Sequence, residues 1–245
     1  APVTIDTGRM LEELLSAVEF DIVHVHDPFA PSVASAALRH SRSLNVGSFH
    51  EPTERVLSTE VARPLVEVFL GRLDARTASS KATAALMSRY FRSEYELLVP
   101  GADSGTADWP DLEIEHADPV RIAYWACEER GALRLFLRAL RRLPLELEWE
   151  AVVIAERPAD ISLRINRVLR ERITVIDATE WRPEDVLAAA DVVCAASGGP
   201  QPAPGVIRTG LAAGAVPVVA QLPEYEELAL DGRAGLLFPP GDAIT

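Results

Sequence analysis

Residues 21–28, Asp-Ile-Val-His-Val-His-Asp-Pro, decide the fold of this chain together with residues 45–52, Asn-Val-Gly-Ser-Phe-His-Glu-Pro. Each segment is a short apolar or β-branched run that ends in a histidine, an acid and a proline, which is typical of a buried parallel strand. The alanine-rich residues between them, 29–43, have a helical pattern. Because open α/β sheets bind ligands at the carboxyl ends of their strands, the sequence predicts a strand, helix, strand unit whose histidines converge on one crevice.

The composition is typical of a soluble globular protein that is large enough for two domains. The chain has 245 residues, of which 48% are hydrophobic and 25% are charged. Its formal net charge of -13 argues against nonspecific electrostatic binding to nucleic acid or to an anionic bilayer. The two cysteines, Cys127 and Cys194, both lie in apolar runs, so we expect buried thiols in a reducing compartment and no disulfide framework.

The sequence contains no predicted membrane span. No apolar run reaches the roughly 18 residues that a spanning helix requires, and the amino terminus lacks a basic region followed by an apolar stretch. These features predict a cytoplasmic protein and leave open a peripheral contact with the inner face of a membrane. The oligomeric state cannot be predicted from the sequence.

Apolar periodicity predicts two α/β domains joined by a linker. Residues 101–119 shift to Gly, Asp, Ser, Thr and Pro, so we place the boundary there: a domain at 1–105, a linker at 106–119 and a domain at 120–245. Strands are expected at 78–80, 120–126, 149–155, 173–176, 192–195 and 216–219. Helices are expected at 8–20, 64–74, 81–91, 132–143, 162–169, 183–190 and 206–213.

Four stretches carry a family resemblance. They are His-Val-His-Asp-Pro-Phe-Ala-Pro-Ser at 24–32, Phe-His at 49–50, Pro-Gly-Ala-Asp at 100–103, and Leu-Ala-Ala-Gly-Ala-Val-Pro-Val-Val-Ala at 211–220. Over nearly its whole length the chain resembles the retaining GT-B glycosyltransferases of the phosphatidylinositol mannosyltransferase type. The resemblance implies α/β GT-B architecture, with two Rossmann-like parallel-sheet domains that face each other across a cleft. Such enzymes begin with a glycine-rich loop and two further strands, so it also implies that the N-terminal domain is incomplete and the chain is a fragment or a trimmed relative.

On the acceptor side, the resemblance implies that His50 is the catalytic residue, close to the anomeric centre of the donor sugar. His26 and Asp27 would line the acceptor-side cleft. An imidazole can donate or accept a hydrogen bond near neutral pH, which suits that position. Two alternatives remain: His50 merely caps its strand, or it forms a metal site with His24, His26 and Asp27. The resemblance favours no metal and no cofactor, with a nucleotide-diphosphate sugar as the donor substrate.

On the donor side, the chain departs from the family pattern. Ala126 stands where active relatives have an arginine, and Arg130 replaces a lysine. Two glutamates of those relatives correspond to Gln201 and Thr209, and prolines interrupt the glycine-rich turn between them. The donor-binding residues that the resemblance implies are Arg130, Gly131, Gln201, Gly205, Val206 and Thr209.

Two adjacent acids, Glu128 and Glu129, follow the first strand of the second domain. They either oppose the charge that develops on the leaving diphosphate or lie in a solvated turn. With the missing arginine and glutamates, they weaken the expected donor site.

Three functional hypotheses follow. The first is a glycosyltransferase that moves a hexose, with mannose as the first candidate, from a nucleotide-diphosphate sugar to a lipid or polyol acceptor with retention. The second is a catalytically impaired pseudo-glycosyltransferase that acts as a binding or partner protein. The third, a sugar-nucleotide epimerase, explains the histidine strands less well. None of them involves nucleic acid.

Overall fold

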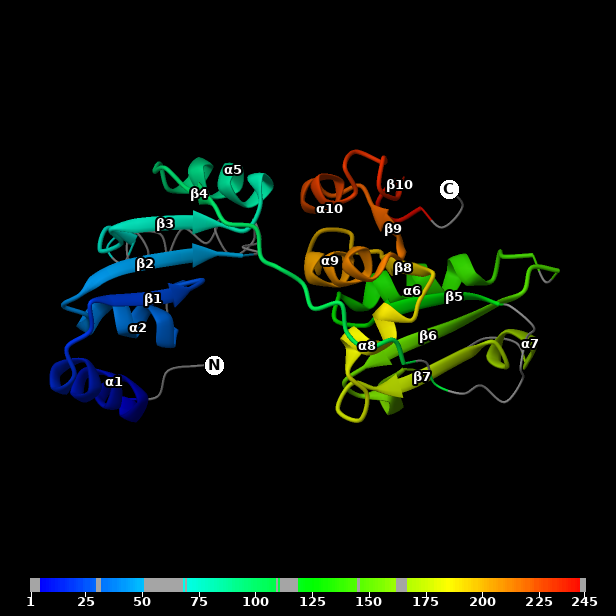
Figure 1. The fold of residues 1–245 in the computed structure, drawn as a ribbon, viewed down its shortest axis with the longest axis horizontal. Helices are drawn as coiled ribbons and strands as arrows, with labels where there is room; N and C mark the ends of the chain where they lie inside the picture. Colours follow the sequence, from blue (N-terminus) through cyan, green and yellow to red (C-terminus); the bar gives the residue numbers. More distant parts are fainter. Residues whose placement is uncertain are drawn as a thin grey trace. The chain divides into compact units, whose positions relative to one another are not determined.

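The structure is a computed structural model that divides into two compact units, residues 1–100 and 101–245. It describes residues 5–29, 32–50, 68, 70–108, 110, 119–144, 146–161 and 167–242. Figure 1 shows each unit as a parallel sheet with helices packed against it. The two parallel-sheet α/β domains expected from the sequence are therefore confirmed. Of the predicted linker, 106–119, only residues 106–108, 110 and 119 are described.

The first unit has a four-stranded parallel sheet in the order β1-β2-β3-β4. Its strands are β1 (Ile22–His26), β2 (Leu44–Phe49), β3 (Ala75–Ala78) and β4 (Glu96–Leu97). Its helices are α1 (Ile5–Ala17), α2 (Val33–His40) and α5 (Lys81–Tyr90). His26 pairs in register with Ser48, so the carboxyl ends of β1 and β2 lie side by side.

Serine caps fix the starts of two helices in this unit. The Ser32 side chain accepts a hydrogen bond from the backbone N–H of Ser35, while the Ser32 N–H donates to the Ser35 hydroxyl, which forms a capping box at α2. Ser80 accepts from the N–H of Thr83 at the start of α5. These caps fix the points at which the chain turns from the strand ends into the helices.

The second unit has a six-stranded parallel sheet in the order β10-β9-β8-β5-β6-β7. Its strands are β5 (Val120–Trp125), β6 (Trp149–Ala155), β7 (Ile173–Asp177), β8 (Val192–Ala195), β9 (Val216–Ala220) and β10 (Leu236–Phe238). Its helices are α6 (Arg130–Leu140), the 3-10 turn η1 (Pro158–Asp160), α7 (Arg167–Arg170), α8 (Pro183–Ala188), α9 (Pro204–Ala213) and α10 (Pro223–Leu228). The strand order reverses between β5 and β8, which makes their carboxyl ends the topological switch point of the sheet.

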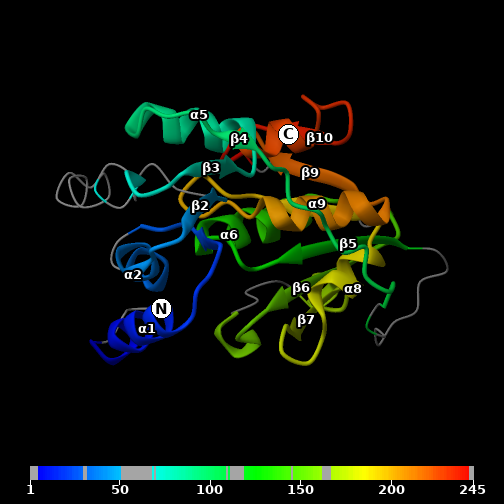
Figure 2. The ribbon, with the colours of Figure 1, turned by 60° about the vertical axis from the view of Figure 1, so that its left-hand side comes forward.

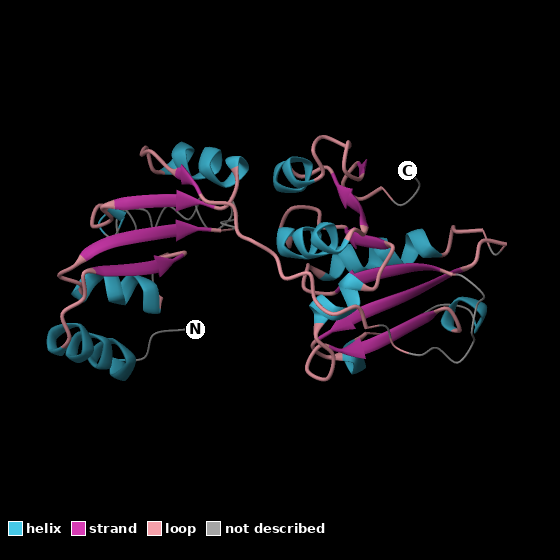
Figure 3. Ribbon diagram, viewed as in Figure 1, coloured by secondary structure: helices cyan, strands magenta, loops and turns pink. Residues whose placement is uncertain are grey.

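Strand alternation gives the second sheet two apolar faces, each covered by helices (Figure 3). Tyr124 and Val153 pack with α6 on one face, whereas Ala123 and Val152 pack with α8 and α9 on the other. Helix α9 lies along β8 and β9 (Figure 2). It begins at Pro204 and is followed by Gly214, whose φ of 92° is the left-handed conformation that favours glycine after a helix. Burial on both faces explains why these strands read as continuous apolar runs.

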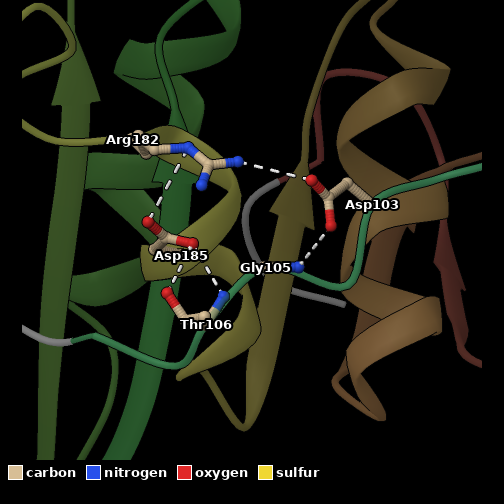
Figure 4. A network of polar contacts seen from close by, with 5 residues as sticks. All are labelled: Asp103, Gly105, Thr106, Arg182 and Asp185. Atoms are coloured by element: carbon tan, nitrogen blue, oxygen red, sulfur yellow. Dashed lines mark hydrogen bonds and ion pairs between the residues drawn. The ribbon is translucent and has the colours of Figure 1, made fainter.

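The loop after Pro100 is bound to helix α8 of the second unit (Figure 4). The backbone N–H and hydroxyl of Thr106 donate to Asp185 Oδ1 at 2.7 and 3.1 Å, and Arg182 Nη2 donates to Asp103 Oδ2 at 3.3 Å. Gly105 has a φ of +63°, and a Cβ there would lie 2.6 Å from the carbonyl oxygen of Glu184. Only glycine therefore fits this close approach.

Most predicted elements are present with shifted ends. The strand predicted at 78–80 is wrong in position, since β3 ends at Ala78 and the two serines that follow it turn away toward His50 and α5. The predictions at 64–74 and 162–169 fall partly outside the described residues. The short strands β4 and β10 were not predicted. Among the helices that the structure describes, none has the length and apolar character that crossing a bilayer requires.

Candidate functional site

In the first unit, the histidines at the ends of β1 and β2 are brought together as predicted from the strand pattern. His26 Nδ1 and His50 Nε2 lie 2.7 Å apart, and their rings stack with centroids separated by 5.0 Å. A hydrogen bond at this distance requires one nitrogen to carry the proton and the other to accept it. The pair can therefore share one proton between two imidazoles, and this bond is lost if both rings become fully protonated.

Asp27 fixes the backbone of the neighbouring strand end. Its φ of 44° lies in the left-handed region, which aspartate tolerates better than most residues. In this conformation its Oδ1 accepts the backbone N–H of His50 at 3.0 Å. The carbonyl oxygen of His50 accepts the hydroxyls of Ser79 at 2.5 Å and Thr83 at 2.9 Å. The main chain of His50 is thus held on both sides, while its ring lies at the sheet edge in contact with His26.

The other histidine of β1, His24, lies two residues before His26 on the same face of the strand. His24 Nε2 lies 2.7 Å from the hydroxyl of Ser48, which lies 2.7 Å from the hydroxyl of Thr77. The rings of His24 and His26 are 4.5 Å apart. Burial, followed by the nearby charges of His26 and His50, lowers the pKa of His24 from its ordinary value. His24, Ser48 and Thr77 thus form a line of polar contacts across the strands β1, β2 and β3.

In the second unit, Glu128 occupies the switch point between β5 and β8. Its side chain is only 9% exposed. Oε2 accepts from Tyr124 Oη at 3.1 Å and from the N–H of Ala196 at 2.8 Å. Oε1 accepts from the N–H of Ser197 at 3.0 Å and from Tyr225 Oη at 2.5 Å. The solvated turn considered from the sequence is therefore wrong for Glu128.

Burial and hydrogen bonding shift the pKa of the Glu128 carboxyl in opposite directions. Burial raises the pKa of the Glu128 carboxyl, and its four hydrogen bonds oppose that shift. The same burial, together with the nearby Glu128, raises the pKa values of Tyr124 and Tyr225 and brings that of Cys194 to about 12. Tyr124, Glu128 and Tyr225 thus form one buried hydrogen-bonded network.

Glu129, the next residue, binds the same loop. Its carboxylate accepts the Ser197 hydroxyl at 2.8 Å and the N–H of Gly198 at 2.7 Å. The Ser197 hydroxyl in turn accepts the N–H of Gly199 at 3.0 Å. We call Glu128, Glu129 and the loop at 196–199 that they bind the carboxylate clamp. Backbone N–H groups in such a loop are the groups that bind anionic ligands in other α/β folds, and here two internal carboxylates already bind three of them.

The predicted donor-binding residues lie at three places in the second unit. Gln201 Nε2 donates to the carbonyl oxygen of Cys127 at 2.7 Å, so it lies against the loop after β5. Val206 packs in the core of the second sheet, and its N–H donates to the carbonyl of Ala203. Thr209 is buried on the same helix, α9, which also contains Gly205 near its start. Arg130 and Gly131 open helix α6 and are exposed.

The sequence did not identify Tyr124, Tyr225, Ser48 and Thr77 as contributors to these two edges. Tyr225 is 97 positions away from Glu128, so no local spacing could have indicated the contact. Within the described part of the chain, His, Cys, Asp and Glu side chains form no group of three or more that could hold a metal ion.

Comparison with known proteins finds a matching family model for each unit. A family model described as Glycosyltransferase Family 4 matches residues 1–105, and one described as glycosyl transferases group 1 matches residues 121–245. The phosphatidyl-myo-inositol mannosyltransferase of Mycolicibacterium smegmatis is 26% identical and aligns with 97% of this chain and 63% of its own length. That of Mycobacterium leprae is 26% identical over 93% of this chain and 62% of its own. The chain thus spans less than two thirds of these curated relatives.

Solved structures share the fold at low sequence identity. Anabaena Alr3699/HepE, solved in complex with UDP, has a TM-score of 0.74 at 17% identity, covering 96% of this chain and 69% of that one. A glycosyltransferase from Rickettsia africae has a TM-score of 0.70 at 13% identity, covering 98% of this chain and 68% of that one. The predicted GT-B fold is confirmed by these neighbours. Since the second family model matches just over half of its residues, the chain belongs to the group 1 glycosyl transferases.

Proposed function

We propose that this protein transfers a hexose from a nucleotide-diphosphate sugar to a lipid or polyol acceptor with retention of configuration, and that mannose is the hexose. Membership of the group 1 glycosyl transferases and the mannosyltransferase relatives support the reaction class and the sugar. One fold neighbour was solved with UDP-glucose, which supports a nucleotide sugar as the donor.

The observation that carries the proposal is the hydrogen-bonded pair of His26 and His50 at the carboxyl edge of the first sheet. In the proposed reaction the bond between the anomeric carbon and the diphosphate breaks, and the acceptor oxygen bonds to that carbon on the same face. The acceptor proton ends on the released diphosphate or in water. His50 would hydrogen-bond the sugar near its anomeric centre, with His26 and Asp27 on the acceptor side.

His26 orients the ring of His50 in this proposal. The 2.7 Å contact between His26 Nδ1 and His50 Nε2 uses one ring nitrogen of His50. His50 can then present its other ring nitrogen, Nδ1, to a sugar hydroxyl. Asp27 acts on the backbone of His50 and is a positioning residue.

The carboxylate clamp favours a second candidate, a catalytically impaired glycosyltransferase that acts as a binding or partner protein. Glu128 and Glu129 already accept the N–H groups of residues 196–198. A diphosphate would have to displace a carboxylate to use the same donors. Losing one charge-stabilising contact in an active site costs about 10² to 10³ in rate, so turnover would be low if the clamp persists.

Two measurements test the proposal. Isothermal titration of the full chain with GDP, GDP-mannose, UDP and UDP-glucose measures donor binding, and transfer of labelled hexose to phosphatidylinositol or inositol measures turnover. We expect His50→Ala to lower the transfer rate by about 10² or more, and His40→Ala, at the end of α2, to leave it unchanged. Binding without any turnover would support the second candidate. Failure of every nucleotide sugar to bind would contradict a surviving donor site.

A further inference from the structure

A pocket of about 490 Å³ lies in the first unit, between the start of strand β3 and the end of helix α5. Strand β3 begins at Ala75 and α5 ends at Tyr90, and the helix packs beside the strand (Figure 1). The residues that line the pocket lie within 70–76 and 89–93. Pockets of this volume accommodate small organic ligands.

This pocket lies at the opposite end of α5 from His50. Thr83, in the first turn of the helix, donates its hydroxyl to the carbonyl oxygen of His50, whereas Arg89 and Tyr90 of the last turn line the pocket. The ten residues of α5 span about 15 Å at a rise of 1.5 Å per residue. None of the described lining residues belongs to the second unit. The pocket is therefore distinct from the histidine pair and from the carboxylate clamp.

The pocket is basic, although the protein as a whole is acidic. Arg76, Arg89 and Arg92 line it, and none of the described lining residues is acidic. In the part of the chain that the structure describes, Arg76 and Arg92 form no ion pair, while the whole chain has 37 acidic residues and only 24 lysines and arginines. Three cations that face one volume repel each other, and an anion between them would remove that repulsion.

The end of the helix does not by itself account for three arginines. Arg89 lies in the last turn of α5, where a cation complements the helix dipole. Arg76 comes from strand β3, and its Nη2 donates to the carbonyl oxygen of Leu70 at 2.8 Å. This contact fixes the guanidinium group and leaves further N–H donors for a ligand. Arg92 lies beyond the helix and is exposed, so two cations are in excess of what the dipole explains.

The rest of the wall is mostly apolar or aromatic and contains one hydroxyl; its residues are Leu70, Gly71, Tyr90, Phe91 and Ser93. We propose that the pocket binds a small phosphorylated organic molecule, with its phosphate on Arg76 and Arg92 and its less polar part against the aromatic wall. Guanidinium groups bind phosphate oxygens through paired hydrogen bonds, and the Ser93 hydroxyl adds a further donor. The inference goes beyond the proposed hexose transfer, because it requires binding and no turnover.

The site is tested by calorimetric titration of the full chain with inorganic phosphate, glycerol 3-phosphate and mannose 6-phosphate at low salt. Each of Arg92→Ala and Arg76→Ala removes one charge-assisted contact, so we expect each to raise the Kd by about tenfold. Because Arg76 also binds Leu70, circular dichroism checks that its variant folds, whereas Arg92 is exposed and its loss should not affect folding. Arg39→Ala is the matched control, since Arg39 is exposed in the last turn of α2 and does not line the pocket.

A second set of probes separates a soluble metabolite from a lipid headgroup. Sedimentation with phosphatidylglycerol vesicles, and with phosphatidylcholine vesicles as the control, measures binding to a lipid phosphate. Tighter binding of a soluble organic phosphate than of inorganic phosphate, weakened in Arg92→Ala, assigns the pocket to a metabolite. Binding of phosphatidylglycerol vesicles alone, weakened in the same variant, assigns it to a headgroup.

Two results overturn the proposal: an affinity that is unchanged in both pocket variants, or no binding of any probe at about millimolar concentration. His50→Ala should leave the binding of these probes unchanged, because His50 does not line the pocket. A failure of hexose transfer alone leaves this site intact, so the two proposals fail separately.

Discussion

Replacing Glu128 by alanine removes the acceptor at the centre of the carboxylate clamp. In the native protein this side chain, 9% exposed, accepts the N–H groups of Ala196 and Ser197 and the hydroxyls of Tyr124 and Tyr225. Alanine can accept none of them. The substitution therefore tests whether two loops 68 positions apart are joined by one buried carboxyl.

The size of the loss follows from which donors can find another acceptor. The tyrosine hydroxyls can rotate, so we assign them no cost. The two N–H groups are fixed in the backbone, and each buried donor without a partner costs about 1–3 kcal/mol. Relief from burying the carboxyl offsets part of the resulting 2–6 kcal/mol or so. We expect the free energy of unfolding to fall by about 3 kcal/mol, a large share of the roughly 5–15 kcal/mol typical of a domain.

Urea denaturation followed by tryptophan fluorescence measures this loss, because all four tryptophans lie after residue 100 and report on the second unit. Glu146→Ala is the control: Glu146 is exposed, and its loss should change stability by no more than about 0.5 kcal/mol. An effect of less than about 1 kcal/mol for Glu128→Ala would show that the four hydrogen bonds do not form.

The pH dependence of Glu128→Ala gives an independent check. Burial raises the pKa of Glu128 in the folded protein above its ordinary value of 4.5. Between pH 4.5 and this raised pKa, the folded protein therefore binds more protons than the unfolded chain. The resulting stability is fully present below pH 4.5 and is lost as the pH rises through the folded pKa. The difference in stability between wild type and variant should therefore narrow as the pH rises through that range. A difference that is constant with pH would contradict the raised pKa.

Further predictions concern other parts of the two units. Glu129→Ala frees the Gly198 N–H, so calorimetry should show GDP binding about tenfold tighter, and unchanged affinity would argue against competition by the clamp. Gly210→Ala places a Cβ 2.8 Å from Val193 Cγ2, so urea denaturation should show a loss of about 1–3 kcal/mol. Burial raises the pKa of Cys194 to about 12, so a thiol reagent at pH 8 should label it more slowly in the folded protein than after unfolding. Because the pKa of His24 is lowered in the folded protein, its contribution to the free energy of unfolding is present above pH 6.5 and is lost as the pH falls through the pKa of the folded state. An NMR titration of the His24 ring should therefore show protonation at a pH below 6.5.

The first-unit edge could be predicted from sequence because it depends on local order. A parallel strand that ends in His26 and a second that ends beside His50 must bring those residues to the same edge, whatever the remaining chain does. The conformation of Asp27 could not be predicted, because its positive φ depends on the contact with His50 that it makes after the sheet has formed. The strand predicted at 78–80 failed for a related reason: the Ser79 hydroxyl binds the His50 carbonyl and the Ser80 side chain caps α5, so the chain turns into the helix there.

The switch point of the second unit shows where reasoning from motif positions alone is insufficient. Comparison of positions identifies the missing arginine and glutamates, but not the groups that bind the backbone N–H donors of this loop. Buried N–H groups require a partner, and here Glu128 and Glu129 supply it from the adjacent loop. Glu128 is enclosed by two tyrosines, whereas Glu129 is partly exposed and can turn toward water. A diphosphate that reached this loop would therefore compete first with Glu129, and the N–H groups bound to Glu128 would stay closed to it unless the buried network opened.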